Sequence, residues 1–192
     1  MDVIVRNSRG MLLIPVKSRL LSERKVFIEG EITTAAANEF MHVLMHLTQE
    51  DPAAPVSVYI DSPGGSVQAG LMMYDLLKGL KLTVNIYCTG MAASMAAILL
   101  AGGQKGHRFV LPHAKIMIHE PLIAGGVGGS ATSIQKTAES IMETKRLTVD
   151  LMSADTGKSR KEVEEAIAFD NYMNAHEAVK FGIADAIVKS VF

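Results

Sequence analysis

The feature that most constrains the fold is an alternation of strand-like and helix-like segments across residues 25–101. Residues 25–30, 56–61 and 82–88 are short and rich in β-branched and aromatic residues, which is typical of strands. Each is followed by a segment with apolar residues at helical spacing. Successive strand–helix units of this kind predict an α/β fold around a largely parallel sheet.

The second half of the chain is less regular. Residues 107–111 and 114–120 are strand-like, and a Gly-rich segment at 123–131 follows them. A long amphipathic helix is predicted from about Thr132 to Ser153, and the sequence SRKE at 159–162 is a capping box that predicts a further helix. A long helix after a Gly-rich segment favours an appendage used for contacts.

Length and composition indicate an ordinary globular protein. The 192 residues suffice for one domain with a hydrophobic core, and 48% hydrophobic with 20% charged residues argues against a disordered or fibrous chain. A net charge of -1 provides no general basic field, so we expect neither nucleic acid nor a membrane surface as a partner. The single cysteine, Cys88, excludes an internal disulfide and suits a reducing compartment.

The sequence shows neither a targeting signal nor a membrane-spanning segment. Arg6, Arg9 and Lys17 interrupt the first apolar residues, which argues against a secretory signal. A bilayer span needs about 20 consecutive apolar residues, and the chain has no such run. We therefore expect a cytoplasmic protein.

Two turns lie where the predicted strands lead into helices, which is where open α/β sheets place their functional crevice. At the first, Pro63, Gly64 and Gly65 let the backbone turn sharply and expose its amides; an ordinary strand-to-helix turn capped by Ser66 explains the same residues. At the second, Ser94 should lie at or just before a helix start. It is either a nucleophile with the Met95 N–H beside it, or a cap or small core residue.

The histidines offer several candidates for a base. His119 ends an apolar strand and can reach the same crevice as Ser94, although a structural histidine is an equal alternative. His42 and His46 have the spacing of a metal-chelating pair on a helix, but a surface role is favoured because the glutamate of a zincin motif is missing. Cys88 ends an apolar strand, which favours a buried and inert thiol.

A resemblance to nucleotide-binding loops does not hold. The sequence ADTGKS at 154–159 ends like a Walker A motif, but Met152 stands where the first glycine belongs and a helix precedes it. We therefore expect no nucleotide site, and no metal or other cofactor in this chain.

From about residue 18 onward, the chain resembles the proteolytic subunit of the Clp protease family. The resemblance lies in the ordered motifs SRLLSERKVFI, YIDSPGGSVQAGLMMYDLL, GMAASMAAILLAGG, RFVLPHAKIMIHEPL and DNYMNAHEAVKFGIAD. It implies an α/β fold of the ClpP/crotonase-like type, with a protruding helix–strand handle over about 123–155. Residues 18–192 would form one peptidase domain, and 1–17 an axial N-terminal segment.

The resemblance also implies a function. The family is one of serine endopeptidases that stack two heptameric rings around a chamber, and an AAA+ ATPase delivers unfolded polypeptides and uses the ATP. Carried over by motif, Ser94 is the nucleophile, His119 the general base and Asp170 the residue that orients it. The oxyanion donors fall on the amides of Gly65 and Met95. An extended substrate would lie beside Gly65, Ser66, Val67 and Leu122.

Some positions depart from the family pattern. Met91 replaces a glutamine, Glu120 follows the base where glutamine is usual, and Ala168 and Phe169 replace an Asp-Arg pair. These departures favour a divergent paralogue. They keep open the alternative of a mainly structural subunit of a ring mixed with a second ClpP. A less favoured alternative is a crotonase-like acyl-CoA enzyme, which shares the fold and an amide oxyanion hole. The Ser-His-Asp set argues against it, because that chemistry needs no serine nucleophile.

Overall fold

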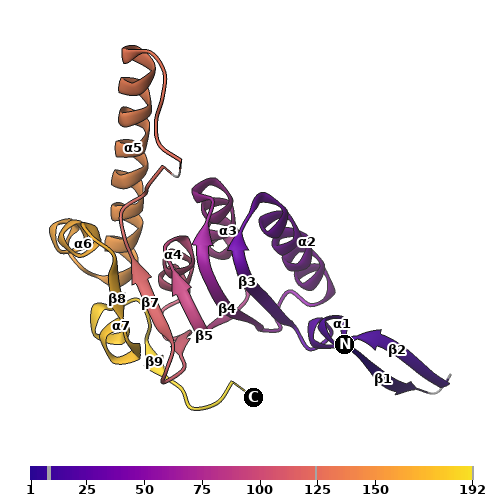
Figure 1. Ribbon diagram of the computed structural model, residues 1–192. Coiled ribbons are helices and arrows are strands. Elements are labelled where there is room, and N and C mark those ends of the chain that lie inside the picture. The colour runs from indigo at the N-terminus through magenta and orange to yellow at the C-terminus, as the bar shows by residue number, and fades with distance from the viewer. Residues whose placement is uncertain (8–9, 124, 192) are drawn as a thin grey trace.

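The structure is a computed structural model that describes residues 1–7, 10–123 and 125–191 (Figure 1). Strands and helices alternate through much of the described chain. In order, the elements are β1 (Asp2–Asn7), β2 (Gly10–Pro15), α1 (Val16–Leu21), β3 (Lys25–Ile32), α2 (Thr34–Glu50), β4 (Val56–Gly65), α3 (Val67–Gly79), β5 (Val84–Ala93), α4 (Met95–Ala101), β6 (Arg108–Val110), β7 (Lys115–Ile118), α5 (Ala131–Thr156), α6 (Arg160–Ile167), β8 (Asn171–Met173), α7 (Ala175–Phe181) and β9 (Ala186–Ile187).

The main sheet confirms the predicted α/β fold with a mostly parallel sheet. Its strands run in the order β3-β4-β5-β6-β9, all in parallel pairs. The first half of β5 pairs with β6 and its second half, Met91 to Ala93, pairs in parallel with β7. β8 then adds to β7 antiparallel. The same edge of β5 therefore pairs first with β6 and then with β7. Strands β7 and β8 form a short arm of the sheet beside the C-terminal end of β5.

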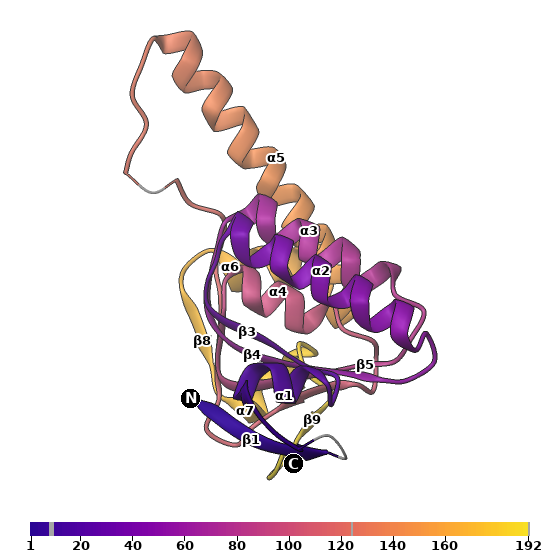
Figure 2. The ribbon, with the colours of Figure 1, turned by 90° about the vertical axis from the view of Figure 1, so that its right-hand side faces the viewer.

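Helices α2, α3 and α4 cover one face of the sheet as a layer (Figure 2). Thr33 accepts a hydrogen bond from the Ala36 amide at the start of α2, and α2 ends at Glu50, directly before Asp51 and Pro52. Every residue of α4 is buried, so this helix lies at the centre of the core. Its first residue follows Ser94 directly, so the rigid core fixes the position of that serine.

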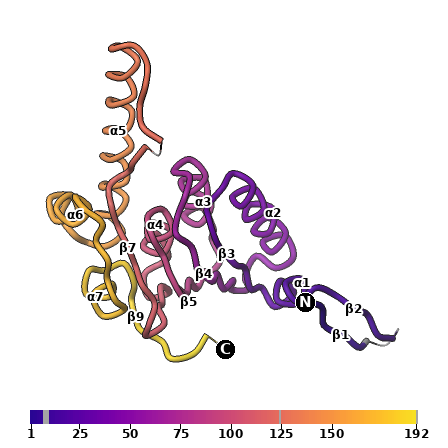
Figure 3. Tube along the Cα trace, in the orientation of Figure 1, coloured from indigo at the N-terminus to yellow at the C-terminus, as the bar shows by residue number. Residues whose placement is uncertain are grey.

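Helix α5 protrudes from the body, as predicted for the handle (Figure 1, Figure 2). Its buried residues are confined to its final part: Thr148, Val149, Met152 and Asp155. The chain rises from the end of β7 to the far tip of α5 and returns through the helix (Figure 3). The described residues 119–123 and 125–130 contain no strand, so the strand half of the expected handle is not formed in the single chain. Next, α6 begins with the predicted capping box of Ser159 and Glu162.

The first residues form a hairpin that the sequence analysis did not predict. β1 and β2 pair antiparallel, with Val3 opposite Ile14, and extend away from the sheet beside α1 (Figure 1). Their apolar side chains Ile4, Met11 and Leu13 are exposed. Apolar residues are consecutive at positions 3–5 and 11–14, so the sequence has no alternation of apolar and polar residues that would indicate strands here. Within the described ranges, no helix has both the length and the apolar character needed to span a membrane.

Candidate active site

Ser94 occupies the sharp junction between β5 and α4. Its backbone has φ 54° and ψ −123°, and among the described residues only Arg24 shares a positive φ without being glycine. The Ser94 N–H donates to the Met117 carbonyl at 2.8 Å, and its own carbonyl accepts from the Ala97 N–H at 3.0 Å. Its hydroxyl makes no capping bond although it holds the N-cap position. Such a conformation costs roughly 1–3 kcal/mol and persists where the surrounding structure enforces it.

The imidazole of His119 lies next to the Ser94 hydroxyl. The two meet because β5 and β7 are parallel neighbours with Ala93 opposite Met117, so that both strands end at the same edge. The Nε2 atom of His119 lies 2.9 Å from the Ser94 Oγ, within hydrogen-bond distance. The side chain of His119 is largely buried, with 15% exposed. The structure thus selects His119 over the other five histidines as the partner of Ser94.

Asp170 lies on the other side of the imidazole. In the antiparallel ladder of β7 and β8, Ile118 stands opposite Asn171, so the next residues outward, His119 and Asp170, face each other. The Oδ1 of Asp170 is 3.3 Å from the Nδ1 of His119. The three predicted side chains are therefore in contact in sequence: Ser94 with His119, and His119 with Asp170.

The turn at the end of β4 touches the start of α4. Gly64 has φ 90°, and a Cβ there would lie 2.8 Å from the Ser94 Cβ and 3.1 Å from the Met95 amide nitrogen. A Cβ on Gly65, at φ 151°, would instead lie 2.4 Å from the Ile32 carbonyl oxygen. Only glycine fits this approach. Gly64 and the Met95 amide accordingly lie beside Ser94, whereas Gly65 is paired with Ile32 of β3. The assignment of the Gly65 and Met95 amides as oxyanion donors stays a prediction.

Ser62 holds this turn in place, a role that the sequence patterns do not predict. Its side chain is buried, donates to the Gly30 carbonyl at 2.6 Å and accepts the Gly64 N–H at 3.1 Å. One hydroxyl thus connects β3 to the turn. A serine between strand and glycines is the only sequence signal for this role, and it is a weak one because turn serines are common.

The residues expected beside the substrate fall into two groups. Val67 and Leu122 line one open groove of about 730 Å³ between the start of α3 and helix α5. Ser66 caps α3 through its Oγ, and its N–H donates to the Ile32 carbonyl at 2.8 Å. Two of the predicted contact residues thus line the same groove, although Ser94 and His119 are not part of its lining. The side chain and amide of Ser66 serve the fold.

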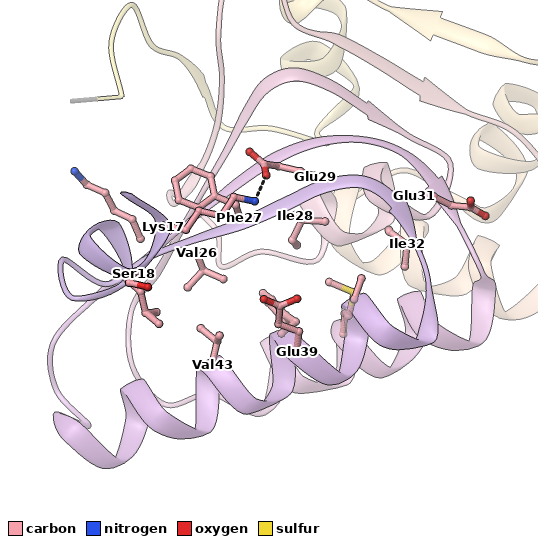
Figure 4. Close-up of a pocket in the computed structure, with 15 residues that line it drawn as sticks. Lys17, Ser18, Val26, Phe27, Ile28, Glu29, Glu31, Ile32, Glu39 and Val43 are labelled. Atoms are coloured by element: carbon pink, nitrogen blue, oxygen red, sulfur yellow. Dashed lines mark hydrogen bonds and ion pairs between the residues drawn. The ribbon is translucent and has the colours of Figure 1, made fainter. Parts of the chain in front are cut away.

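A second cavity, of about 290 Å³, lies between α1, β3 and α2 (Figure 4). Lys17 and Glu29 both line this cavity and form an ion pair, with 2.6 Å between Nζ and Oε2. Glu31 and Glu39 also line it. None of the predicted site residues lines it. It is therefore separate from the serine–histidine arrangement.

The other candidates from the sequence lie apart from Ser94. His42 and His46 are exposed on α2, and in the ranges 1–7, 10–123 and 125–191 there is no cluster of His, Cys, Asp and Glu suited to a metal ion. Cys88 is buried, and this burial, together with the charge of Asp61, raises the pKa of its thiol to about 12. A thiol in that environment is a poor nucleophile at neutral pH.

A sequence model of the Clp protease family matches residues 8–191, nearly the whole chain. The chain therefore belongs to the Clp protease family, and the resemblance found in the motifs is confirmed. Proteins of this family are peptidases of the serine class.

Proposed function

From membership of the Clp protease family and the 2.9 Å contact between Ser94 and His119, we propose that this chain is a serine endopeptidase subunit that degrades unfolded polypeptides. The contact carries the proposal because a serine hydroxyl is a weak nucleophile unless a base within hydrogen-bond reach removes its proton. Asp170, 3.3 Å from the far nitrogen of the same imidazole, supplies the orienting group.

The proposed reaction is acyl transfer to Ser94. The Oγ attacks the peptide carbonyl carbon while the Nε2 of His119 takes the hydroxyl proton, which gives a tetrahedral oxyanion. His119 then returns the proton to the departing amine, the C–N bond breaks, and an acyl-serine remains. Water attacks this ester with His119 again as the base, and the carboxyl product leaves.

The amides of Gly65 and Met95 are proposed to bind the oxyanion. Backbone donors at the start of a buried helix are fixed before the reaction begins, so they need no reorganisation as charge develops. The close fit of Gly64 against Ser94 and Met95 supports this assignment. Losing one such donor costs about 3 kcal/mol of transition-state stabilisation in comparable enzymes.

The groove beside Val67 and Leu122 is proposed to hold the substrate as an extended strand. Main-chain pairing with Gly65 to Val67 on one side and Leu122 on the other reads little of the side-chain sequence, which suits a broad range of unfolded polypeptides. The chain itself needs no cofactor in this mechanism, and ATP is used by a partner AAA+ ATPase.

We further propose that the chain acts in stacked heptameric rings, with residues 18–192 as the peptidase domain and the N-terminal hairpin on the ring axis. Large apolar side chains exposed on and around the handle support assembly, because contact with other subunits would remove them from water. They are Leu122, Ile123, Val127, Ile134, Met142 and Leu147.

A second candidate is a mainly structural subunit of a ring mixed with another ClpP. The side chain of Phe169 is 87% exposed directly beside Asp170, where the family has charged residues. An exposed phenylalanine at this position favours contact with a partner surface that differs from the usual one.

Covalent labelling separates these functions. The purified chain is treated with a fluorophosphonate, alone and together with a second Clp subunit from the same source, and the labelled residue is mapped by mass spectrometry. Labelling of Ser94 in the chain alone supports the peptidase, and labelling only in the mixture supports the mixed assembly. Ser94→Ala must abolish the signal, while Ser18→Ala, at an exposed serine away from the site, must retain it. Absence of label under both conditions contradicts the proposed peptidase.

A further inference from the structure

The backbone that carries His119 lies beyond the strand pairing that positions β7. The last paired residues of the β7–β8 ladder are Ile118 and Asn171. Residues 119–123 have no regular secondary structure. Contacts other than a strand ladder must therefore hold the histidine in place.

Glu120 supplies two such contacts, one on each side of the segment. Its N–H donates to the carbonyl of Ile167, the last residue of α6, at 2.9 Å. Its carboxylate pairs with the Nζ of Lys145 on α5. The residue next to His119 is thus connected to two helices that belong to different parts of the fold.

Lys145 lies where α5 leaves the body. The buried part of α5 begins at Thr148, whose Oγ donates to the Lys145 carbonyl at 3.0 Å. Residues spaced three apart share a helix face, so Lys145 projects from the side of α5 on which Thr148 packs. Thr148 in turn lines a small cavity together with Ser94 and His119. The lysine therefore stands about one helical turn from Thr148, the residue of α5 that borders the cavity of Ser94 and His119.

We propose that the ion pair between Lys145 and Glu120 is a positioning device that keeps His119 within hydrogen-bond reach of Ser94. This inference rests on the peptidase function proposed above. Neither residue is a catalytic residue, since no contact joins them to the Ser94 Oγ or the imidazole; they act through the backbone of the segment they hold. Without the pair, the segment keeps the bond from Glu120 to α6 and the contacts of the imidazole with Ser94 and Asp170. With one anchor of the backbone lost, the imidazole spends less time beside Ser94.

The size of the effect follows from the exposure of the pair. The side chains of Lys145 and Glu120 are 28% and 45% exposed, so their attraction is partly screened by water. Pairs of this kind shift a conformational equilibrium by about two- to fivefold. Because the pair holds the base and not the substrate, the loss is expected in kcat with KM unchanged.

Peptidase kinetics on the assembled protein test this proposal, in whichever assembly the fluorophosphonate labels Ser94. Lys145→Met is expected to lower both kcat and the labelling rate about two- to fivefold at constant KM. Lys145→Arg keeps the charge and should retain the rate, and the exchanged pair Glu120→Lys with Lys145→Glu should recover most of it. Arg146→Met, the loss of an exposed charge at the next position of α5, is the matched control and should have no effect.

The dependence of kcat on salt concentration is a second measurement, and it would not change if Lys145 had a purely structural role. About 1 M NaCl screens an exposed ion pair, so the difference between the parent protein and Lys145→Met should shrink at high salt. Equal kcat in the parent and in Lys145→Met, or no recovery in either Lys145→Arg or the exchanged pair, would overturn the inference. A parent protein that is never labelled at Ser94 contradicts the proposed function instead, so the two failures are distinct.

Discussion

The carboxylate of Asp170 lies 3.3 Å from the Nδ1 of His119, yet 60% of the Asp170 side chain is exposed while only 15% of the His119 side chain is. Charge in contact with water interacts weakly across several ångströms. We therefore expect Asp170 to act mainly by fixing the tautomer and the direction of the imidazole, so that Nε2 faces Ser94.

This relationship predicts a partial loss of activity for Asp170→Asn. The amide keeps the shape of the side chain but presents a different hydrogen-bonding partner to Nδ1. A buried orienting aspartate contributes about ten thousandfold in serine proteases, and we expect about a hundred- to thousandfold here because Asp170 is exposed. The rate of fluorophosphonate labelling at Ser94 measures the loss. Asp75→Asn, at an exposed position on α3, is the matched control. A wild-type labelling rate in Asp170→Asn would contradict the assigned role.

The glycine turn predicts that Gly64→Ala is inactive. The added methyl group would lie 2.8 Å from the Ser94 Cβ, at a φ of 90° that side chains rarely adopt. Relief of this overlap must move either the turn or the start of α4, and the oxyanion donors move with it. We expect labelling of Ser94 to fall about a hundredfold or more. Gly79→Ala, at the end of α3 with open space around its Cα, should label normally.

Ser62→Ala separates positioning from chemistry. The variant leaves the Gly30 carbonyl and the Gly64 N–H without their buried partner, which costs about 1–3 kcal/mol of folding free energy. The freed turn should also lower kcat by about tenfold, since a donor displaced by a fraction of an ångström stabilises the oxyanion less well. Urea unfolding and peptidase kinetics measure the two effects. Ser62→Cys, which restores a weak donor, should recover part of the activity; full activity in Ser62→Ala would show that the turn needs no tether.

Much of the fold follows from local patterns. The strand–helix alternation, the cap of α2 at Thr33 and the capping box at Ser159 each depend on residues within a few positions of one another. Such signals are present in a single sequence. The pairing of β1 with β2 has no such signal, because the apolar residues at 3–5 and 11–14 are consecutive and do not alternate with polar ones.

The site depended on information that local patterns lack. Ser94 was expected at a helix start, but its contact with His119 depends on the register between β5 and β7, and the contact with Asp170 depends on that between β7 and β8. These registers join segments far apart in the chain, and only the family resemblance selected one histidine among six. Ser62 was missed for the same reason, since its partner Gly30 is 32 residues away.

A buried ion pair fastens the far end of α4, the helix that starts after Ser94. The guanidinium of Arg108, with only 2% of its side chain exposed, donates to the Ala101 carbonyl at 2.9 Å and pairs with Asp185 at 2.5 Å. Asp185 also accepts the Gly106 N–H at 2.8 Å. Burial by itself would raise the pKa of Asp185, but the hydrogen bonds and the charge of Arg108, with the Gly106 amide, outweigh it and hold the pKa below its usual value.

This depressed pKa predicts that Asp185 contributes less stability as the pH falls. A carboxyl whose folded pKa lies below its unfolded value of about 3.9 stabilises the fold fully above that value, and loses the contribution as the pH falls through the folded pKa. Asp185→Asn leaves Arg108 buried without a counter-charge, so we expect a loss of about 2–4 kcal/mol at pH 7. The difference in free energy of unfolding between the parent protein and Asp185→Asn should become smaller below about pH 4. Urea unfolding at fixed protein concentration, at neutral and acidic pH, measures both, with Asp75→Asn as the control. An equal difference at both pH values would show that Asp185 acts through shape and not through charge.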